Sequence, residues 1–311
     1  MIKTQTKVAI IGSGFVGSSA AFALALNGIA NEVVLIDVNK EKAFGEAMDI
    51  NHGLSYVGQM NMHSGDYDEC RDCDVIVITA GANRKVGETR LDLARKNVAI
   101  AKDITANVMK HYTKGVILVV SNPVDVLTYM IQKWSGLPDG RVMGSGTVLD
   151  SARFRYYISE KLDVDVRNVH GYIIGEHGDS QMPYWSATHV AGKRLEGSEL
   201  LTDSDKASIM EEVRKAGATI IKNKGATYYA IAITINRIIE TILKNQKTIM
   251  TVSSVINNVH GINDVALSLP AVVSPSGVDR LFDMDFTPEE LVLLQNSAAE
   301  VKSVLDQVKD I

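Results

Sequence analysis

The feature that most constrains the fold is a glycine-rich turn of the pattern G-x-G-x-x-G over residues 12–17. The apolar run at residues 7–12 is typical of a buried strand, and residues 13–27 have the Ala- and Leu-rich spacing of a helix that Gly28 ends. The pattern is weak by itself because glycine is common, but between a strand and a helix it predicts a turn that cradles a pyrophosphate. Its first glycine allows the tight bend, its second lets phosphates approach the backbone, and its third lets the helix pack on the strand.

Asp37 strengthens the prediction of a dinucleotide site. It ends the next predicted strand, Glu32–Asp37, twenty residues past Gly17, where a carboxylate accepts hydrogen bonds from ribose hydroxyls. The same carboxylate repels a 2′-phosphate, and Val38 and Asn39 offer no arginine to hold one. The sequence therefore predicts NAD rather than NADP as the cofactor, and a glycine-rich turn without a ligand is the alternative.

Alternating apolar strands and helices indicate an α/β fold class. Further buried strands are expected at residues 74–79 and 116–120, with a helix at 40–50. Strands that are apolar on both faces predict a parallel sheet covered by helices on both sides, so we expect a doubly wound Rossmann domain over residues 1–144.

The second half, residues 145–311, is expected to form an α+β substrate domain. Its predicted elements are a helix at 147–162, a strand at 166–174, a helical stretch at 203–244 broken at Gly225, an antiparallel pair at 249–255 and 265–273, and a helix from Pro288 to Lys309. A cleft between the two halves is the natural place for a ligand.

Composition and charge narrow the setting in which the chain works. The net charge of −5 and the lack of a dense Lys/Arg run argue against a nucleic-acid surface. No apolar stretch reaches membrane-spanning length and the first residues carry no secretory signal, so we expect a cytoplasmic protein without a membrane partner. Cys70 and Cys73 form a C-x-x-C, but no second ligand pair accompanies them, so we expect no metal site.

Three polar stretches carry candidate chemistry. His177 lies between two glycines directly after an apolar run, where an imidazole is held rigidly yet remains approachable for proton exchange, and a satisfied turn histidine is the alternative. Asp150 and Arg153 are three residues apart on one predicted helix, so their side chains share a face. The alternative is that they form an ordinary ion pair within the helix. Residues 80–90 carry three cations, with Gly81 and Gly87 as hinges, which predicts closure over a bound anion, or else a solvated basic loop.

Together these segments resemble the L-lactate/L-malate dehydrogenase family over essentially the whole chain. The matching motifs are the glycine-rich turn, Gly-Glu-Thr-Arg at 87–90, Ser-Asn-Pro-Val-Asp at 121–125, Leu-Asp-Ser-Ala-Arg at 149–153 and Gly-Glu-His-Gly-Asp-Ser at 175–180. The resemblance implies an NAD-dependent enzyme that transfers hydride reversibly between NADH and a small 2-keto acid, assembled as a homotetramer or dimer. A binding protein without the chemistry would lack His177, Asp150, Arg153 or Arg90, and all four are present.

The resemblance also implies catalytic roles. His177 is similar to the family's proton donor and acceptor, and Asp150 to the carboxylate that orients it and raises its pKa. Arg153 resembles the residue that grips the substrate carboxylate, and Arg90 the one that polarises the keto oxygen once the loop excludes water.

Further positions are implied to contact ligands. Asn122 would bond the substrate oxygen and help to hold His177, and Thr227 would line the substrate pocket. The residues implied to contact the cofactor are Gly12, Gly14, Phe15, Val16, Gly17, Asp37, Thr79, Ala80, Gly81, Asn97, Val120 and Asn122.

Arg84 occupies the position that selects the substrate side chain in this family, where lactate enzymes usually have glutamine and malate enzymes arginine. An arginine suits the distal carboxylate of oxaloacetate, whereas opposite the methyl group of pyruvate it would be a desolvated charge without a partner. Against this, residues 87–93 and 225–229 are similar to those of lactate enzymes. The expectation leans to L-malate/oxaloacetate, with L-lactate/pyruvate as the alternative.

Arg155 and His170 are candidate allosteric residues. They match positions that bind fructose 1,6-bisphosphate at a subunit interface in regulated bacterial lactate enzymes, where an arginine and a histidine facing their symmetry mates make a phosphate site. Simple surface placement explains them equally well.

Overall fold

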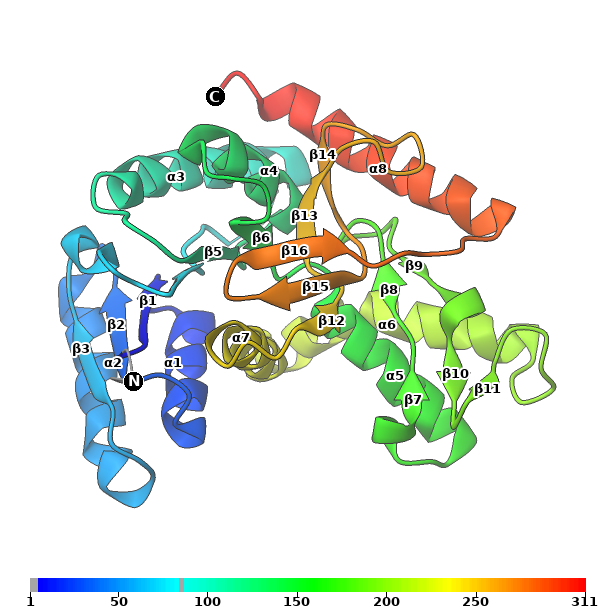
Figure 1. Ribbon diagram of the computed structural model, residues 1–311, viewed down its shortest axis with the longest axis horizontal. Coiled ribbons are helices and arrows are strands. Elements are labelled where there is room, and N and C mark those ends of the chain that lie inside the picture. Colours follow the sequence, from blue (N-terminus) through cyan, green and yellow to red (C-terminus); the bar gives the residue numbers. More distant parts are fainter. Residues whose placement is uncertain (1–4, 84–86) are drawn as a thin grey trace.

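The computed structural model of the protein describes residues 5–83 and 87–311. Its main element is an eight-stranded sheet with the order β14-β13-β6-β5-β4-β1-β2-β3 (Figure 1). The strands are β1 (Lys7–Ile11), β2 (Glu32–Ile36), β3 (Asn61–Ser64), β4 (Val75–Ile78), β5 (Val116–Val119), β6 (Val142–Gly144), β13 (Ser253–Ile256) and β14 (Val265–Ser268). The six N-terminal strands are parallel, which confirms the predicted Rossmann sheet.

Two hydrophobic cores cover the two faces of this sheet. Because successive strand residues point to opposite faces, Val8 and Ile10 pack in one core and Ala9 and Ile11 in the other. The first core contains α1 (Phe15–Asn27), α2 (Lys40–Gly53) and α7 (Tyr229–Leu243), and the second contains α3 (Arg90–Met109), α4 (Val124–Ser135) and α8 (Pro288–Val308). Since α7 and α8 come from the C-terminal half, the two halves share both cores, and the division at residue 144 remains a prediction.

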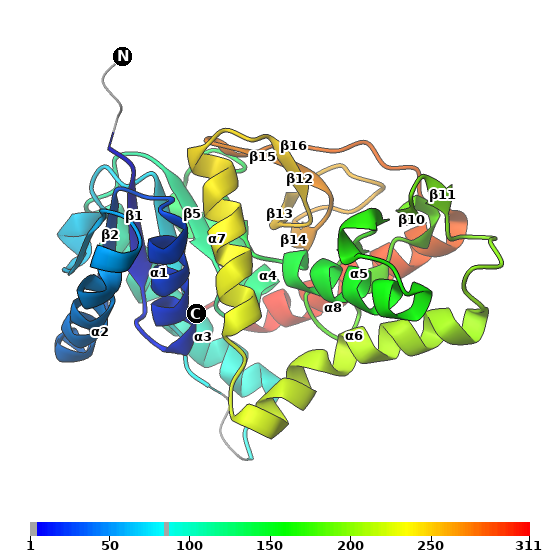
Figure 2. The same ribbon diagram turned by 90° about the horizontal axis from the view of Figure 1, so that it is seen from below.

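The remaining elements lie mainly on the side of the molecule away from α1 and α2 (Figure 1). They comprise the helices α5 (Val148–Leu162) and α6 (Asp203–Lys224), the short 3-10 helices η3 (Val166–Asn168) and η4 (Trp185–Ala187), and the strands β7 (Val169–His170), β8 (Ile173–Ile174), β9 (Met182–Pro183), β10 (His189–Val190), β11 (Lys193–Arg194), β12 (Thr248–Met250), β15 (Ala271–Ser274) and β16 (Gly277–Leu281). Two further 3-10 helices lie with the N-terminal elements: η1 (Leu54–Tyr56) directly follows α2, and η2 (Tyr67–Cys70) contacts α3. Figure 2 shows α6 running past α5 to meet α7, which stands beside α1.

The predicted antiparallel pair at 249–255 and 265–273 has the right direction but spans two sheets. β13 pairs with β14 in the main sheet, whereas β12 pairs with β15 in a separate sheet with β16. Both predicted strands pass from one sheet to the other at the same place. Pro270, which has no N–H to donate, lies between β14 and β15, where the second strand makes this passage.

The single strand predicted at 166–174 is also divided. It is a 3-10 turn followed by β7, which pairs with β10, and β8, which pairs with β9. The break falls at Gly171, where an added Cβ would lie 2.9 Å from both Phe154 and Thr188, so a glycine is needed for this close packing.

Glycine and proline residues mark the helix boundaries that the sequence predicts. Gly28 ends α1 in the left-handed conformation, Gly225 with φ +87° separates α6 from α7, and Pro288 is the first residue of α8. Among the described residues, no helix combines the length and the apolar character that crossing a bilayer requires.

Candidate active site

The glycine-rich turn joins β1 to α1 and leaves no room for larger residues at its two ends. A Cβ at Gly12, whose φ is +104°, would lie 2.6 Å from the backbone nitrogen of Ala80, and one at Gly17 would lie 1.9 Å from the carbonyl oxygen of Gly12. Thr79 Oγ1 donates to the same carbonyl oxygen at 2.8 Å. By contrast, a Cβ at Gly14 would meet no atom within 4 Å, so the middle of the turn faces open space.

That open space is a cavity of about 900 Å³ along the ends of β1, β2 and β4. Its lining includes the predicted cofactor residues Gly12, Gly14, Asp37, Thr79, Ala80 and Gly81, together with Tyr67, Ile100 and Ile104. Asp37 closes one end, with Oδ2 accepting from the backbone N–H of Ser13 at 2.6 Å and Oδ1 from that of Asn39 at 2.8 Å. Backbone donors at a helix N-terminus and a carboxylate at the next strand end are the groups that a pyrophosphate and a ribose need, so these residues fit a dinucleotide.

Asn97 holds the loops around the cavity rather than lining it. Its side chain is buried, its Oδ1 accepts from the backbone N–H of Ala82 at 2.7 Å, and its Nδ2 donates to the carbonyl oxygen of Asn122 at 2.7 Å. Val120 is likewise buried, whereas Phe15 is exposed at the start of α1. Asn97 therefore ties together the loops that follow β4 and β5.

His177 lies in the turn after β8, which Gly175 enters with φ +88°. Its Nδ1 is 2.6 Å from Oδ2 of Asp150, a buried residue in the first turn of α5. Oδ1 of Asp150 accepts from Nη1 of Arg153 at 3.0 Å. The structure thus joins three predicted residues into one chain of hydrogen bonds, with Nε2 of His177 left to face a ligand.

The electrostatics of this group favour a charged imidazole. Burial opposes protonation of His177, but the charge of Asp150 and its hydrogen bond outweigh that penalty and raise the pKa of His177 to about 9. Burial also disfavours the Asp150 carboxylate, yet His177 and Arg153 together keep its pKa below the ordinary value. The pair can therefore store a proton at neutral pH and release it to a basic oxygen.

Asp125 is a functional candidate that the sequence interpretation did not single out. Its Oδ2 accepts from the backbone N–H of His177 at 2.7 Å, and its Oδ1 accepts from Oγ of Ser253 at 2.6 Å. Burial raises the pKa of Asp125 to about 6 against the effect of these two hydrogen bonds. No hydrogen bond joins Asn122 to His177 in the described chain, so the backbone of the histidine is held by Asp125 instead.

Asp125 gives little signal in the sequence. It stands in the first turn of α4, where an acidic residue is common for reasons of helix stability alone. Its partners come from the turn after β8 and from β13, and no local pattern connects these segments. Because Asp125 follows β5, it places His177 at the same edge of the sheet as the glycine-rich turn.

Arg90 is the first residue of α3, which a capping box of Thr89 and Asp92 begins. Its Nη1 donates to Oδ2 of Asp179 at 2.6 Å, so the loop arginine reaches the turn that carries His177. The predicted selector, Arg84, lies outside the described residues.

The other predicted ligand residues lie on the rim or away from the cavity. Asn122 is exposed at the end of β5, and Thr227 is half-buried in the link between α6 and α7. Arg155 and His170 are neighbours, because Nη1 of Arg155 donates to the carbonyl oxygen of Gly171 at 3.3 Å.

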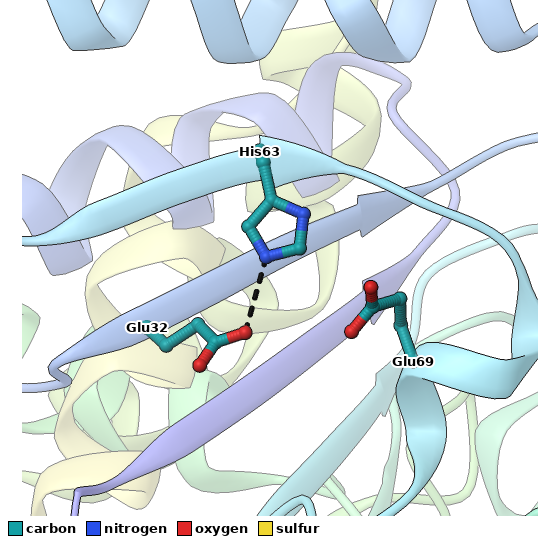
Figure 3. A group of neighbouring side chains, drawn as sticks. All are labelled: Glu32, His63 and Glu69. Carbon is teal, nitrogen blue, oxygen red and sulfur yellow. Dashed lines mark hydrogen bonds and ion pairs between the residues drawn. The ribbon is translucent and has the colours of Figure 1, made fainter.

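A separate polar cluster lies at the opposite end of the strands and contains Glu32, His63 and Glu69 (Figure 3). His63 Nε2 is 3.1 Å from Oε1 of Glu32, and the ammonium of Lys7 lies 2.6 Å from Glu69 and 3.4 Å from Glu32. Lys7 therefore already supplies the positive charge that these carboxylates attract.

Cys70 and Cys73 are both fully buried and free. Burial raises the pKa of each thiol to about 12, so both are protonated at neutral pH and fill space in the core.

A parallel sheet with a dinucleotide turn, and a carboxylate–imidazole pair at the same edge, define the class of the protein: it is an NAD-dependent oxidoreductase that moves a hydride together with a proton.

Comparison with known proteins gives the family. The model of the lactate/malate dehydrogenase NAD-binding domain matches residues 6–144, and that of the family's alpha/beta C-terminal domain matches residues 147–311. The L-lactate dehydrogenase of Priestia megaterium is 49% identical over 305 residues, which are 97% of this chain and 96% of that protein. That of Thermoanaerobacter pseudethanolicus is 47% identical over 309 residues, 98% of this chain and 99% of that protein.

Solved structures agree with the family models. An L-lactate dehydrogenase from Clostridium thermocellum has 63% sequence identity and a TM-score of 0.89, and the alignment covers 98% of this chain and 99% of that one. The minor L-lactate dehydrogenase of Enterococcus mundtii, in a ligand-bound form, has 44% identity and a TM-score of 0.95 with the same coverage. The chain belongs to the lactate/malate dehydrogenase family.

Proposed function

We propose that the protein is an L-lactate dehydrogenase that reduces pyruvate with NADH and runs in reverse on L-lactate. The observation that carries the chemistry is the 2.6 Å contact between His177 Nδ1 and buried Asp150, which makes the imidazole a strong but reversible proton store. The choice of pyruvate is supported by the relatives, which are named L-lactate dehydrogenases at 47–49% identity over nearly their full length.

In the reducing direction, His177 begins as an imidazolium with Nδ1 held by Asp150. Arg153, anchored through Asp150, presents its remaining N–H groups to the substrate carboxylate, and Arg90 presents its own to the keto oxygen. The chemistry that NADH would supply when bound in the cavity is a hydride for the keto carbon. The Nε2 proton of His177 then moves to the keto oxygen, which gives the L-2-hydroxy acid and leaves a neutral imidazole. Asn122, which follows β5, would bond that oxygen.

The cofactor is proposed to lie along the 900 Å³ cavity, with its pyrophosphate on the N-terminus of α1. The backbone of Gly14, Phe15 and Val16 would donate to the phosphates, and Asp37 would accept from the adenosine ribose. Thr79 holds the turn through its hydrogen bond to the carbonyl oxygen of Gly12, and Asn97 holds the loops after β4 and β5 beside the cavity.

A second candidate substrate is oxaloacetate, with L-malate as the product. The specific observation in its favour is Arg84, because a second arginine on the closing loop matches a second carboxylate and would be costly opposite a methyl group.

One experiment separates the two candidates. NADH consumption is measured with pyruvate and with oxaloacetate for the wild type, Arg84→Gln and, as a control for charge, Arg95→Gln on the exposed face of α3. A wild type with the higher kcat/KM on pyruvate supports lactate dehydrogenase. A wild type that prefers oxaloacetate, and an Arg84→Gln variant that switches to pyruvate, would establish the second candidate, and turnover of neither acid would refute both.

The protein is further proposed to be a homo-oligomer, a dimer or tetramer. The helices α1, α2 and α7 are neighbours (Figures 1 and 2). Each of them carries large apolar side chains that are exposed to solvent. These are Phe22, Leu26, Phe44, Met48 and Ile233. We propose that a second copy of the chain packs on these side chains. Light scattering of the wild type and of Ile233→Glu tests this proposal, and an unchanged molecular mass in the variant would contradict it.

Arg155 and His170 are proposed to bind fructose 1,6-bisphosphate. Burial lowers the pKa of Arg155, which has no acidic partner within the described chain, and the ring of His170 stacks on that of His189 at 5.2 Å. Activation by the bisphosphate that disappears in Arg155→Gln would support this site, and an absence of activation in the wild type would leave surface placement as the explanation.

A further inference from the structure

The link between α6 and α7, residues 225–228, is held in an unusual way. Gly225 ends α6 with φ +87°, and Tyr228 has φ −151° and ψ −28°, outside the helical region. Within the described chain, the backbone N–H groups of residues 226–228 donate no hydrogen bond, and neither does the hydroxyl of Thr227. Hydrogen bonding therefore leaves the position of Thr227 unspecified.

Aromatic contacts hold the link instead. The ring of Tyr228 stacks on that of Phe15 with centroids 5.2 Å apart and 23° between the planes. The ammonium of Lys224 lies 3.5 Å from the Tyr228 centroid and 3.9 Å from that of Tyr229, so a cation covers the aromatic pair. We call Phe15, Tyr228 and Lys224 the aromatic clasp.

The clasp begins inside the dinucleotide turn. Phe15 is the first residue of α1 and directly follows Gly14, whose surroundings are open. Phe15 is 67% exposed, so apolar burial does not fix its ring, and the stack on Tyr228 is a contact that can restrain it. α1 and α7 both start at the clasp, and Nδ2 of Asn27 meets Oδ1 of Asn236 at 3.3 Å further along the two helices.

We propose that the aromatic clasp couples cofactor binding to the substrate pocket. A dinucleotide bound at the glycine-rich turn immobilises Phe15, and Phe15, through its stack on Tyr228, sets the position of Thr227. A pyrophosphate bound to the backbone of residues 14–16 restrains the segment from which the Phe15 ring projects, and a stacked ring transmits that restraint because slipping it loses contact area. Phe15 and Tyr228 are then positioning residues, and the part that concerns Thr227 rests on the proposed function.

Proteolysis tests the clasp without turnover. Lys222 and Lys224 are exposed at the end of α6, directly before the link, and trypsin cleaves after both. Stacked aromatic pairs of this kind are worth roughly threefold to tenfold in an equilibrium, so saturating NADH is expected to slow cleavage at these lysines by that factor in the wild type. Fragments are identified by mass, and each variant is first titrated with NADH by fluorescence so that saturation is known.

The variants separate stacking from bulk. Phe15→Ala and Tyr228→Ala are expected to abolish the protection by NADH at saturation, whereas Tyr228→Phe, which keeps the ring, retains it. Tyr56→Ala removes a tyrosine that is 90% exposed outside the clasp and is expected to behave as the wild type. Thermal melting without NADH checks that every variant is folded. Equal protection in the wild type and Phe15→Ala would overturn the proposal.

Kinetics separates the clasp from the proposed function. The KM for pyruvate is expected to rise about threefold to tenfold in either alanine variant, with a smaller change in kcat, and the double variant is expected to add little to either single change. Additive effects would mean that the two rings act independently and would refute the coupling. If the wild type turns over neither keto acid, the proposed function fails, while the proteolysis still decides on the clasp.

Discussion

Replacing Asp150 by asparagine tests the proton store of the site directly. The change keeps the size of the side chain and a hydrogen bond to His177 Nδ1 but removes the buried negative charge. The pKa of His177 stands at about 9 against an ordinary 6.5, and at about 1.4 kcal/mol per unit this difference corresponds to about 3 kcal/mol in favour of the imidazolium. Because burial of the ring acts in the opposite direction, loss of Asp150 should return the pKa to 6.5 or below.

The pH profile of keto acid reduction should move with that pKa. Reduction requires the imidazolium, so kcat/KM of the wild type should fall as the pH rises through about 9, and that of Asp150→Asn as it rises through 6.5 or lower. At pH 8 the protonated fraction of His177 would drop from about nine-tenths to a few per cent, a loss of about 30-fold. A further loss independent of pH is expected, because the variant also leaves Arg153 without its carboxylate partner.

The measurement is kcat/KM for NADH-dependent reduction between pH 5.5 and 10, under saturating cofactor. Asp163→Asn is the matched control: Asp163 ends the same helix with φ 52°, a conformation that asparagine tolerates, and it is exposed and distant from His177. The control should keep the wild-type profile. A midpoint that stays near 9 in Asp150→Asn would show that a group other than Asp150 raises the pKa of His177, and the assignment of Asp150 as the source of that shift would be wrong.

Three further changes test other parts of the site. His177 has a raised pKa in the folded state, so the stability that its protonation contributes is complete below pH 6.5 and is lost as the pH rises through about 9. The free energy of unfolding measured with urea should therefore fall by up to about 3 kcal/mol across this window. In His177→Asn the free energy of unfolding should depend less on pH. Gly17→Ala places a Cβ 1.9 Å from a carbonyl oxygen and should weaken NADH binding at least tenfold in fluorescence titrations, whereas Gly45→Ala, with open space around it in α2, should stabilise by about 0.5–1 kcal/mol. Asp125→Asn leaves one acceptor oxygen for two donors, the backbone N–H of His177 and the hydroxyl of Ser253. The free energy of unfolding from calorimetry should therefore fall by about 1–3 kcal/mol, and unchanged stability would argue that the buried carboxylate is not needed.

The sequence predicts the cofactor half well because its signals are local. The glycine-rich turn, the apolar strands and the helix end at Gly28 each depend on a few adjacent residues, and the parallel direction of the strands follows from their alternation with helices. Helices α3 and α4 were not predicted, although the Thr89/Asp92 capping box marks where α3 begins.

The geometry of the catalytic group was less accessible. A three-residue spacing on one helix predicts that Asp150 and Arg153 are neighbours, and resemblance to the family assigns them roles, but neither gives the bond from Asp125 to the backbone of His177. That hydrogen bond joins α4 to the turn after β8, and the second carboxylate oxygen of Asp125 accepts a hydrogen bond from Ser253 in β13. Contacts among three distant segments depend on tertiary packing, which single-sequence patterns do not encode.

The addition of β13 and β14 to the main sheet explains why the catalytic turn is placed so firmly. Ser268 in β14 is fully buried and exchanges two backbone hydrogen bonds with Gly175, at 2.8 and 3.0 Å, just before His177. Its hydroxyl accepts from the backbone N–H of Thr147 at the start of α5, the helix that carries Asp150. One strand of the main sheet therefore fixes both His177 and Asp150, because it binds the turn that leads to His177 and the start of the helix that carries Asp150.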